Sequence, residues 1–385
     1  MKKRDLILFL IASAFLGISQ SIDASVFNNF LNDTFNITVS QRTILEFPRE
    51  FPGFLVVLVS GALLALGDVR IAAIANILAA IGMMGLGYLS KSFGTMMIWM
   101  TIYSMGQHLF LPMSNSIGMS LADKNSMGKV LGRISGVNTA AFLVTSLATA
   151  LLFRLVKVSY PVAYTVGAIA FLGSAIFIFM MAPNKTKIKG KRFFLKKRYT
   201  LFYLLSILYG ARKQIFVTFG PWVLIKIFNQ GVTTFAMLGF IIAGIGMFFK
   251  PFVGTLIDKK GERYVLAAEA ILLIGVCTGY AVAGNLGLNV DTALIITAAC
   301  YIIDQLLVAA GMARATYLNK IAISPEDVSP TLSMGISLDH IVAMIVPWLG
   351  GLVWATFGYE MVFILGAVIA LINLLLTRGI NTLQE

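Results

Sequence analysis

Long apolar runs recur along the whole chain and constrain its fold more than any other feature. Each run is about as long as the roughly 20 residues that an α-helix needs to cross the hydrocarbon core of a bilayer. A helix satisfies its own backbone hydrogen bonds inside lipid, where no water is available to do so. We therefore expect an all-α membrane protein with about 12 transmembrane helices.

The predicted spans form two groups of six. The first group comprises residues 6–31, 42–67, 70–90, 94–121, 128–153 and 160–182. The second group comprises residues 199–224, 232–257, 264–284, 291–318, 331–357 and 359–379. We expect two six-helix bundles, 1–182 and 199–385, joined by a basic cytoplasmic linker at 183–198.

The composition favours a membrane protein over a soluble one. Hydrophobic residues make up 58% of the 385 residues and charged residues only 12%, about half of the usual quarter. The net charge of +13 raises nucleic-acid binding as an alternative, but the Lys and Arg residues gather in the loops, eight of them between Lys185 and Arg198. A linker that lies against anionic lipid accounts for this cluster, and we expect no nucleic-acid partner.

The positions of the basic residues also predict an orientation. With the amino terminus inside, the cytoplasmic segments hold the larger share of Lys and Arg, beginning with Lys2–Arg4 at an uncleaved first span. We expect both termini in the cytoplasm, most simply at a bacterial cytoplasmic membrane. The two cysteines, Cys277 and Cys300, lie in apolar runs and are interpreted as buried hydrophobes, so no disulfide, metal site or cofactor is expected.

A weak internal repeat supports the division into two groups. The segments 103–107 (YSMGQ) and 301–305 (YIIDQ) are related by an offset of 198 residues. Parallel repeats of this kind predict a substrate site near the membrane midplane between the halves.

Ionisable residues within the apolar runs are the candidate substrate and coupling residues. Each is costly in lipid unless it faces a partner or a water-filled cavity. Arg212 is suited to binding an anionic group through its planar guanidinium, and the carboxyls and histidines are suited to carrying a coupling proton. The candidates are Asp23, Glu46, Arg49, Glu50, His108, Arg212, Lys213, Asp304, Asp339 and His340.

Each candidate also has a structural interpretation. Residues 46–50 share one helix face, but they would be solvated if the helix ended earlier than predicted. Arg212 and Lys213 would form ion pairs with buried acids, and His108 would be a packing residue. Glu269 and Arg314, which lie nearer the cytoplasmic face, are interpreted as side chains that snorkel to water or pair in the loops.

The loop Gly254–Arg263 reads GTLIDKKGER. It resembles the G-x-L-x-D-x-x-G-x-R signature of the major facilitator superfamily of secondary transporters. With the dozen spans and the basic linker, the resemblance covers nearly the whole chain. It implies a cytoplasmic gate in which Asp258 forms ion pairs with basic residues such as Lys259 and Arg263. Gly254 and Gly261 would then permit close helix contact and a tight turn.

The chain departs from the superfamily pattern in other places. The loop between the second and third spans, where the signature is usually best kept, is only Gly67–Arg70. We expect Asp68, Arg70 and Arg133 to serve the gate there, with Asp68 pairing to Arg133. The arginine of the fourth span and the glycine-proline motif of the fifth are missing, which argues against drug-proton antiport.

These features predict a proton-coupled secondary transporter that moves a small polar or amphiphilic solute by alternating access and acts as a monomer. Mixed charge in the cavity would favour a zwitterionic or anionic solute. The alternative is a membrane sensor or assembly protein that keeps the fold without transporting. An enzyme is not expected, because the chain carries no recognisable nucleophile or metal constellation.

Overall fold

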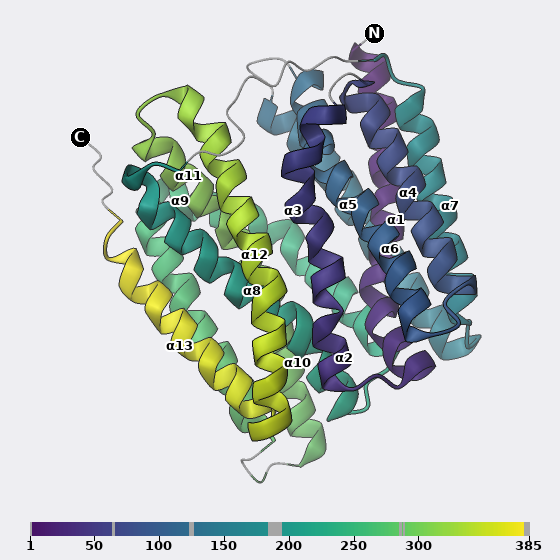
Figure 1. The fold of residues 1–385 in the computed structure, drawn as a ribbon, viewed down its shortest axis with the longest axis vertical. Coiled ribbons are helices and arrows are strands. Elements are labelled where there is room, and N and C mark those ends of the chain that lie inside the picture. The colour runs from purple at the N-terminus through teal and green to yellow at the C-terminus, as the bar shows by residue number, and fades with distance from the viewer. Residues whose placement is uncertain are drawn as a thin grey trace. The chain divides into compact units, whose positions relative to one another are not determined.

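The computed structural model is helical, and no strand occurs in the residues that it describes, 2–63, 66–122, 127–183, 195–284, 287 and 289–380 (Figure 1). Contacts between Cα atoms divide the chain into two compact units. Unit 1 comprises Met1–Asn36, Phe51–Lys189 and Gln230–Gly244, and unit 2 comprises Ile37–Glu50, Gly190–Asn229 and Ile245–Glu385. These units are not the same residue ranges as the two predicted bundles, whose boundaries at 182 and 199 stay a prediction.

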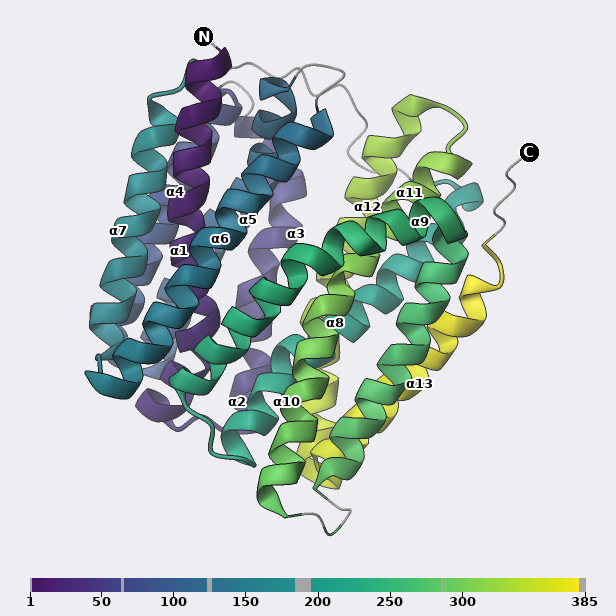
Figure 2. The ribbon, with the colours of Figure 1, turned by 180° about the vertical axis from the view of Figure 1, so that it is seen from behind.

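Unit 1 is organised around three neighbouring helices. These are α1 (Lys2–Phe35), α4 (Asp68–Tyr88) and α7 (Tyr160–Phe179), which lie side by side in Figures 1 and 2. Two further helices complete the set, with α5 (Phe93–Leu121) packed on α4 and α6 (Met127–Leu155) packed on α1. The larger part of α3 (Glu46–Leu63) and the start of α9 (Val232–Ala283) also belong to this unit.

Glycine allows α4 and α5 to approach closely. A Cβ atom added at Gly106 would lie 2.5 Å from the backbone oxygen of Ala75, and one added at Gly82 would lie 2.4 Å from the backbone nitrogen of Tyr103. A side chain at either position would collide with backbone, which cannot move aside as a flexible side chain can. Small residues of this kind bring helix backbones together inside a membrane.

Unit 2 is organised around α8 (Thr200–Lys226), which follows the short 3-10 helix η2 (Lys197–Tyr199). Helix α8 contacts each of the other helices that complete the unit after α9. They are α10 (Val290–Leu307), α11 (Gly311–Ile321), α12 (Pro325–Phe357) and α13 (Tyr359–Thr377), with the 3-10 helix η3 (Val308–Ala310) between α10 and α11. The short α2 (Val39–Ile44) packs on α12.

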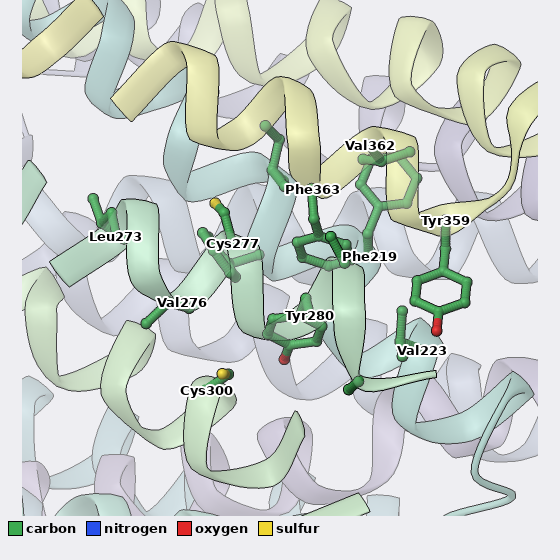
Figure 3. Packing of buried hydrophobic residues seen from close by; sticks show 14 of the residues in the cluster. Phe219, Val223, Leu273, Val276, Cys277, Tyr280, Cys300, Tyr359, Val362 and Phe363 are labelled. Carbon is green, nitrogen blue, oxygen red and sulfur yellow. The ribbon is translucent and has the colours of Figure 1, made fainter. Parts of the chain in front are cut away.

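Aromatic rings form the centre of the unit 2 core (Figure 3). Tyr280 and Phe363 stack with ring centroids 4.2 Å apart, and Phe216 meets Tyr280 edge-on at 5.8 Å. These contacts join α8, α9 and α13 through packing, which is the main source of helix association where lipid replaces water. Cys277 and Cys300 are buried in the same cluster, as the sequence predicted.

Proline and glycine set the breaks in the longer helices. The predicted span 42–67 is divided into α2 and α3, because Pro48 has no N–H to donate to the carbonyl of Ile44. Helix α9 bends at Gly261, whose φ of 80° favours glycine (Figure 2). Its two arms correspond to the predicted spans 232–257 and 264–284.

Eight of the described helices are long and apolar enough to cross a membrane. One of them is the 52-residue α9 with its two arms. The helices α3, α5 and α8, with 18, 29 and 27 residues, also have the length of a span but carry more polar side chains. The predicted all-α membrane class is confirmed, and the helices are consistent with about a dozen spans.

Candidate functional site

Unit 1 contains a cavity of about 610 Å³, a volume within the roughly 300–1,000 Å³ of small-molecule sites. Helices α1, α4, α5, α6 and α7 contribute to its wall. The apolar part of the wall is Leu16, Phe110, Leu111, Leu131, Ile134 and Phe171. The polar part is Ser13, Gln20, Asn76, Gln107, His108, Ser114, Asn115, Ser135 and Asn138, and the described lining residues include no Asp, Glu, Lys or Arg.

Helical spacing places these side chains on common faces. On α1, Ser13, Leu16 and Gln20 follow one another at three- and four-residue steps, and on α6 Ile134 and Asn138 are four residues apart. Among the predicted site residues only His108 lines this cavity. The amides were missed because the sequence interpretation followed charge. The signal that could have found them is a polar stripe at helical spacing on otherwise apolar spans.

Hydrogen bonds hold several of the cavity amides in place. Asn138 Nδ2 donates to the carbonyl oxygen of Ser13 at 3.2 Å and to Gln20 Oε1 at 3.1 Å. His108 Nδ1 lies 2.9 Å from the carbonyl oxygen of Ser104. The side chains are therefore ordered before a solute arrives, which lowers the entropic cost of binding.

A second group of predicted residues surrounds Glu46 in unit 2. Glu46 has no solvent exposure and forms ion pairs with Arg42 and, at 2.6 Å, with Arg49. Gln214 Nε2 on α8 donates to the same carboxylate at 2.6 Å. Glu46 is thus buried and paired rather than a solvated helix end. Arg42 was not among the predicted site residues, and its four-residue spacing from Glu46 was the overlooked signal.

Two further pairs lie in the same unit. Glu50 accepts from Arg49 at 3.1 Å and lies 2.9 Å from His340 Nδ1. Lys213 Nζ on α8 lies 2.8 Å from Asp339 Oδ2 on α12. The structure therefore brings Glu50 to His340 and Lys213 to Asp339.

Arg212 and Asp304 form a deeply buried ion pair between α8 and α10. Arg212 Nη2 on α8 lies 2.8 Å from Asp304 Oδ1 on α10 and also donates to the Asp304 carbonyl oxygen at 3.1 Å. The two side chains are 5% and 2% exposed. Arg212 Nε and Nη1 are buried without a hydrogen-bond partner. This pair thus holds two charges away from water with incomplete hydrogen bonding, an arrangement that is costly and often functional.

Glu269 and Arg314 lie close to this pair. Both are buried, so of the two interpretations from the sequence, snorkelling to water does not hold for them. The closest approach between Arg314 Nη1 and Glu269 Oε2 is 3.9 Å, and the Arg314 guanidinium lies 3.5 Å from the ring centre of Tyr209. Together with Arg212 they line a small second cavity.

The sequence profile of the Major Facilitator Superfamily matches residues 8–326. The chain belongs to this superfamily. A search of curated proteins found none that matches.

Solved superfamily transporters have the same fold. The nucleoside transporter NupG is 12% identical, with a TM-score of 0.75 and coverage of 99% of this chain and 100% of NupG. A bacterial homolog of the human lysosomal transporter Spinster, in an inward-facing and unoccupied conformation, is 16% identical, with a TM-score of 0.71 and coverage of 98% and 97%. The protein is thus an integral membrane protein with a transporter fold, and we describe it as a secondary transporter that acts on a small molecule.

The gate residues predicted for unit 1 are Asp68, Arg70 and Arg133. Asp68 is buried at the first turn of α4 and accepts a hydrogen bond from Ser116 Oγ at 2.5 Å. Arg70 and Arg133 are exposed. The pairing of Asp68 with Arg133 stays a prediction.

The signature segment Gly254–Arg263 contains the bend of α9 at Gly261, in unit 2. Asp258, Lys259 and Arg263 are exposed, and no atom of the described residues outside the helix of Gly254 lies within 4 Å of a Cβ placed at Gly254. The neighbouring Glu262 is buried and binds Lys320 Nζ at 2.9 Å. Glu262 was not among the predicted gate residues. The ion pair links the loop to α11.

The carboxyl-terminal end of the basic linker contacts α12 through Lys196. Lys196 Nζ lies 2.8 Å from Asp327 Oδ2 and 3.0 Å from Oδ1, and Tyr199 OH donates to Oδ2 at 2.6 Å. The backbone N–H of Ile323 donates to Tyr199 OH at 3.2 Å. Four groups outside the apolar part of α12 thus form one hydrogen-bonded cluster.

We expect this cluster to weaken in acid. The hydrogen bonds from Lys196 and then Tyr199 hold the pKa of Asp327 below its usual value of 3.8. Because the pKa is lower in the folded state, the charged carboxylate stabilises the fold above about pH 4 and this contribution is lost as the pH falls further. The Asp327→Asn variant should therefore melt below the parent at neutral pH, and the difference should shrink in acid.

Thermal unfolding in detergent at a series of pH values measures this difference. The matched control is Asp258→Asn, which replaces an exposed carboxylate in the signature loop and should track the parent throughout. A gap between parent and Asp327→Asn that widens on acidification would contradict the assignment.

Proposed function

We propose that the protein is a proton-coupled secondary transporter of a small polar or amphiphilic solute, with alternating access between its two six-helix bundles. The observation that carries the proposal is the buried pair Arg212–Asp304, near the middle of α8 and on α10. A desolvated ion pair contributes little net stability. In a transporter fold, ionisable residues at such a place mark a substrate or proton pathway.

A proton on Asp304 changes the energy of the pair. Protonation removes the counter-charge of Arg212, which then remains buried with Nε and Nη1 already lacking hydrogen-bond partners. The nearby charged groups are Glu269 and Arg314, and Gln305 Nε2 donates to Asp304 Oδ2 at 3.1 Å. An unpaired Arg212 favours a conformation in which it finds another acceptor or water. Proton binding and conformation are then coupled.

The unit 1 cavity supplies the site for the solute in this proposal. Its volume of about 610 Å³ and its amide and hydroxyl groups suit a small polar compound. NupG, which shares the fold, is named as a nucleoside transporter. A nucleoside is one compound of the size and polarity that the cavity would accept.

The remaining predictions extend this account. The linker 183–198 and both termini lie in the cytoplasm, and 1–182 and 199–385 are the two bundles that move. Asp258, Lys259 and Arg263 serve the cytoplasmic gate with Asp68 as its weaker counterpart. The transporter acts as a monomer in a bacterial cytoplasmic membrane.

Proton flux in proteoliposomes tests the proposal. The purified transporter is reconstituted with a pH-sensitive dye in the lumen, and uridine, glucose and other small polar solutes are added outside without an imposed gradient. At least one solute should change the lumenal pH, and a protonophore should abolish the change. Labelled solute that enters without any change of lumenal pH would contradict proton coupling.

A further inference from the structure

We infer that the unit 1 cavity selects an uncharged ring compound that carries hydroxyl groups, a monosaccharide or a nucleoside, over its phosphorylated counterpart. The inference rests on the proposed function, because it assigns a substrate class to the same cavity. This substrate class differs from the zwitterionic or anionic solute that we expected from the buried charges in the sequence.

The first argument is the composition of the cavity wall. None of the described residues that line the cavity is an Asp, Glu, Lys or Arg. The buried cations Arg212 and Lys213 belong to unit 2 and face Asp304 and Asp339. An anion that leaves water for this cavity would find no Lys or Arg among the described residues that line it, and the desolvation cost of an ion without a counter-charge is several kcal/mol.

The second argument is the hydrogen-bonding chemistry of the wall. An amide side chain both donates and accepts, as a hydroxyl group does. The Asn138–Gln20 hydrogen bond uses Nδ2 and Oε1, which leaves Asn138 Oδ1 and Gln20 Nε2 with no partner among the described residues. These groups can satisfy several hydroxyls at once.

The third argument is the apolar part of the wall. Leu16, Phe110 and Phe171 line the cavity beside the amides, and Phe171 is held edge-on against Tyr103 at 6.0 Å between ring centroids. A sugar or nucleobase ring presents apolar faces along with its polar edge. A site with amides on one side and rigid aromatic and aliphatic groups on the other matches both parts.

Binding to the purified transporter tests the inference without transport. The panel pairs each of several nucleosides and monosaccharides with its own phosphate ester, for example uridine with uridine monophosphate and glucose with glucose 6-phosphate. Equilibrium binding and thermal shift should show at least one neutral compound that binds, with its phosphate ester at least about tenfold weaker, which corresponds to roughly 1.4 kcal/mol. Binding that is confined to nucleosides, or confined to monosaccharides, shows which of the two compound classes the cavity takes.

Two variants test whether the neutral compound binds in the unit 1 cavity. Gln20→Leu and Asn138→Ala should each weaken the neutral compound by about tenfold or more, as expected when a buried partner is removed. Asn319→Ala, which removes an exposed amide on α11, is the control and should bind as the parent does. Because Asn138 also joins α6 to α1, the unfolding curve of each variant is recorded, and Gln20→Leu serves if Asn138→Ala does not fold.

The outcomes separate this inference from the proposed function. Phosphate esters that bind as tightly as the neutral compounds, no binding by any neutral compound, or unchanged binding in Gln20→Leu would each overturn the inference. Neutral binding at this site without solute-driven proton flux would leave the inference standing and overturn proton coupling instead.

Discussion

Replacing Arg212 by alanine should lower the free energy of unfolding by about 3–5 kcal/mol, the largest loss of stability that we expect from one substitution here. The variant leaves Asp304, which is 2% exposed, without the guanidinium 2.8 Å away. A buried carboxylate without a partner loses its Coulomb energy and keeps the full cost of desolvation. Chemical unfolding in detergent micelles, followed by circular dichroism, measures the loss.

Lys213→Ala is the matched control for Arg212→Ala. Its ion pair with Asp339 has the same length, 2.8 Å, but its side chains are 23% and 16% exposed. Water can therefore compensate the remaining charge, and the loss should be clearly smaller. The double variant Arg212→Leu with Asp304→Leu should regain much of the stability, because it removes both buried charges. Equal losses for Arg212→Ala and Lys213→Ala would contradict the role of burial.

Asp304→Asn should abolish accumulation driven by a pH gradient while exchange of solute continues. The asparagine keeps nearly the same size but can no longer bind and release a proton. Counterflow, in which labelled solute enters vesicles preloaded with unlabelled solute, needs no coupling and should persist. Accumulation under an imposed pH gradient should fall by at least about tenfold, because coupling requires a change of proton occupancy.

Asp339→Asn is the control for this substitution, since it removes a carboxylate from the more exposed pair of the same unit. It should retain gradient-driven accumulation. The amount of folded Asp304→Asn protein is checked by its unfolding curve, because the change also leaves Arg212 without a charged partner. Full gradient-driven accumulation in folded Asp304→Asn would assign the coupling proton elsewhere.

The helices could be predicted from the sequence because each span must be apolar over its whole length. The break at Gly261 was also predictable, since a positive φ favours glycine. The span 42–67 was predicted as one helix, and its division at Pro48 follows from proline's lack of an N–H group. Helix length and helix breaks depend on nearby residues, so they can be predicted from local sequence patterns.

The partners of the buried charges could not be predicted in the same way. The sequence indicated that Arg212 would pair with a buried acid, but choosing Asp304 requires the rotation of α8 and α10 about their axes. One residue of error turns a helical side chain by about 100° and changes its partner. The cavity was missed for a related reason. Its wall combines polar side chains from five helices, and each alone resembles an ordinary packing residue.

Accumulation of labelled solute in proteoliposomes under an imposed pH gradient, with the membrane potential clamped at zero, tests the central claim most directly. The solute is the neutral compound that binds best to the purified protein. We predict that it accumulates above its external concentration in one direction of the gradient, and that a protonophore reduces the lumenal level to the external concentration. Equal lumenal and external concentrations under both directions of the gradient would contradict proton-coupled transport.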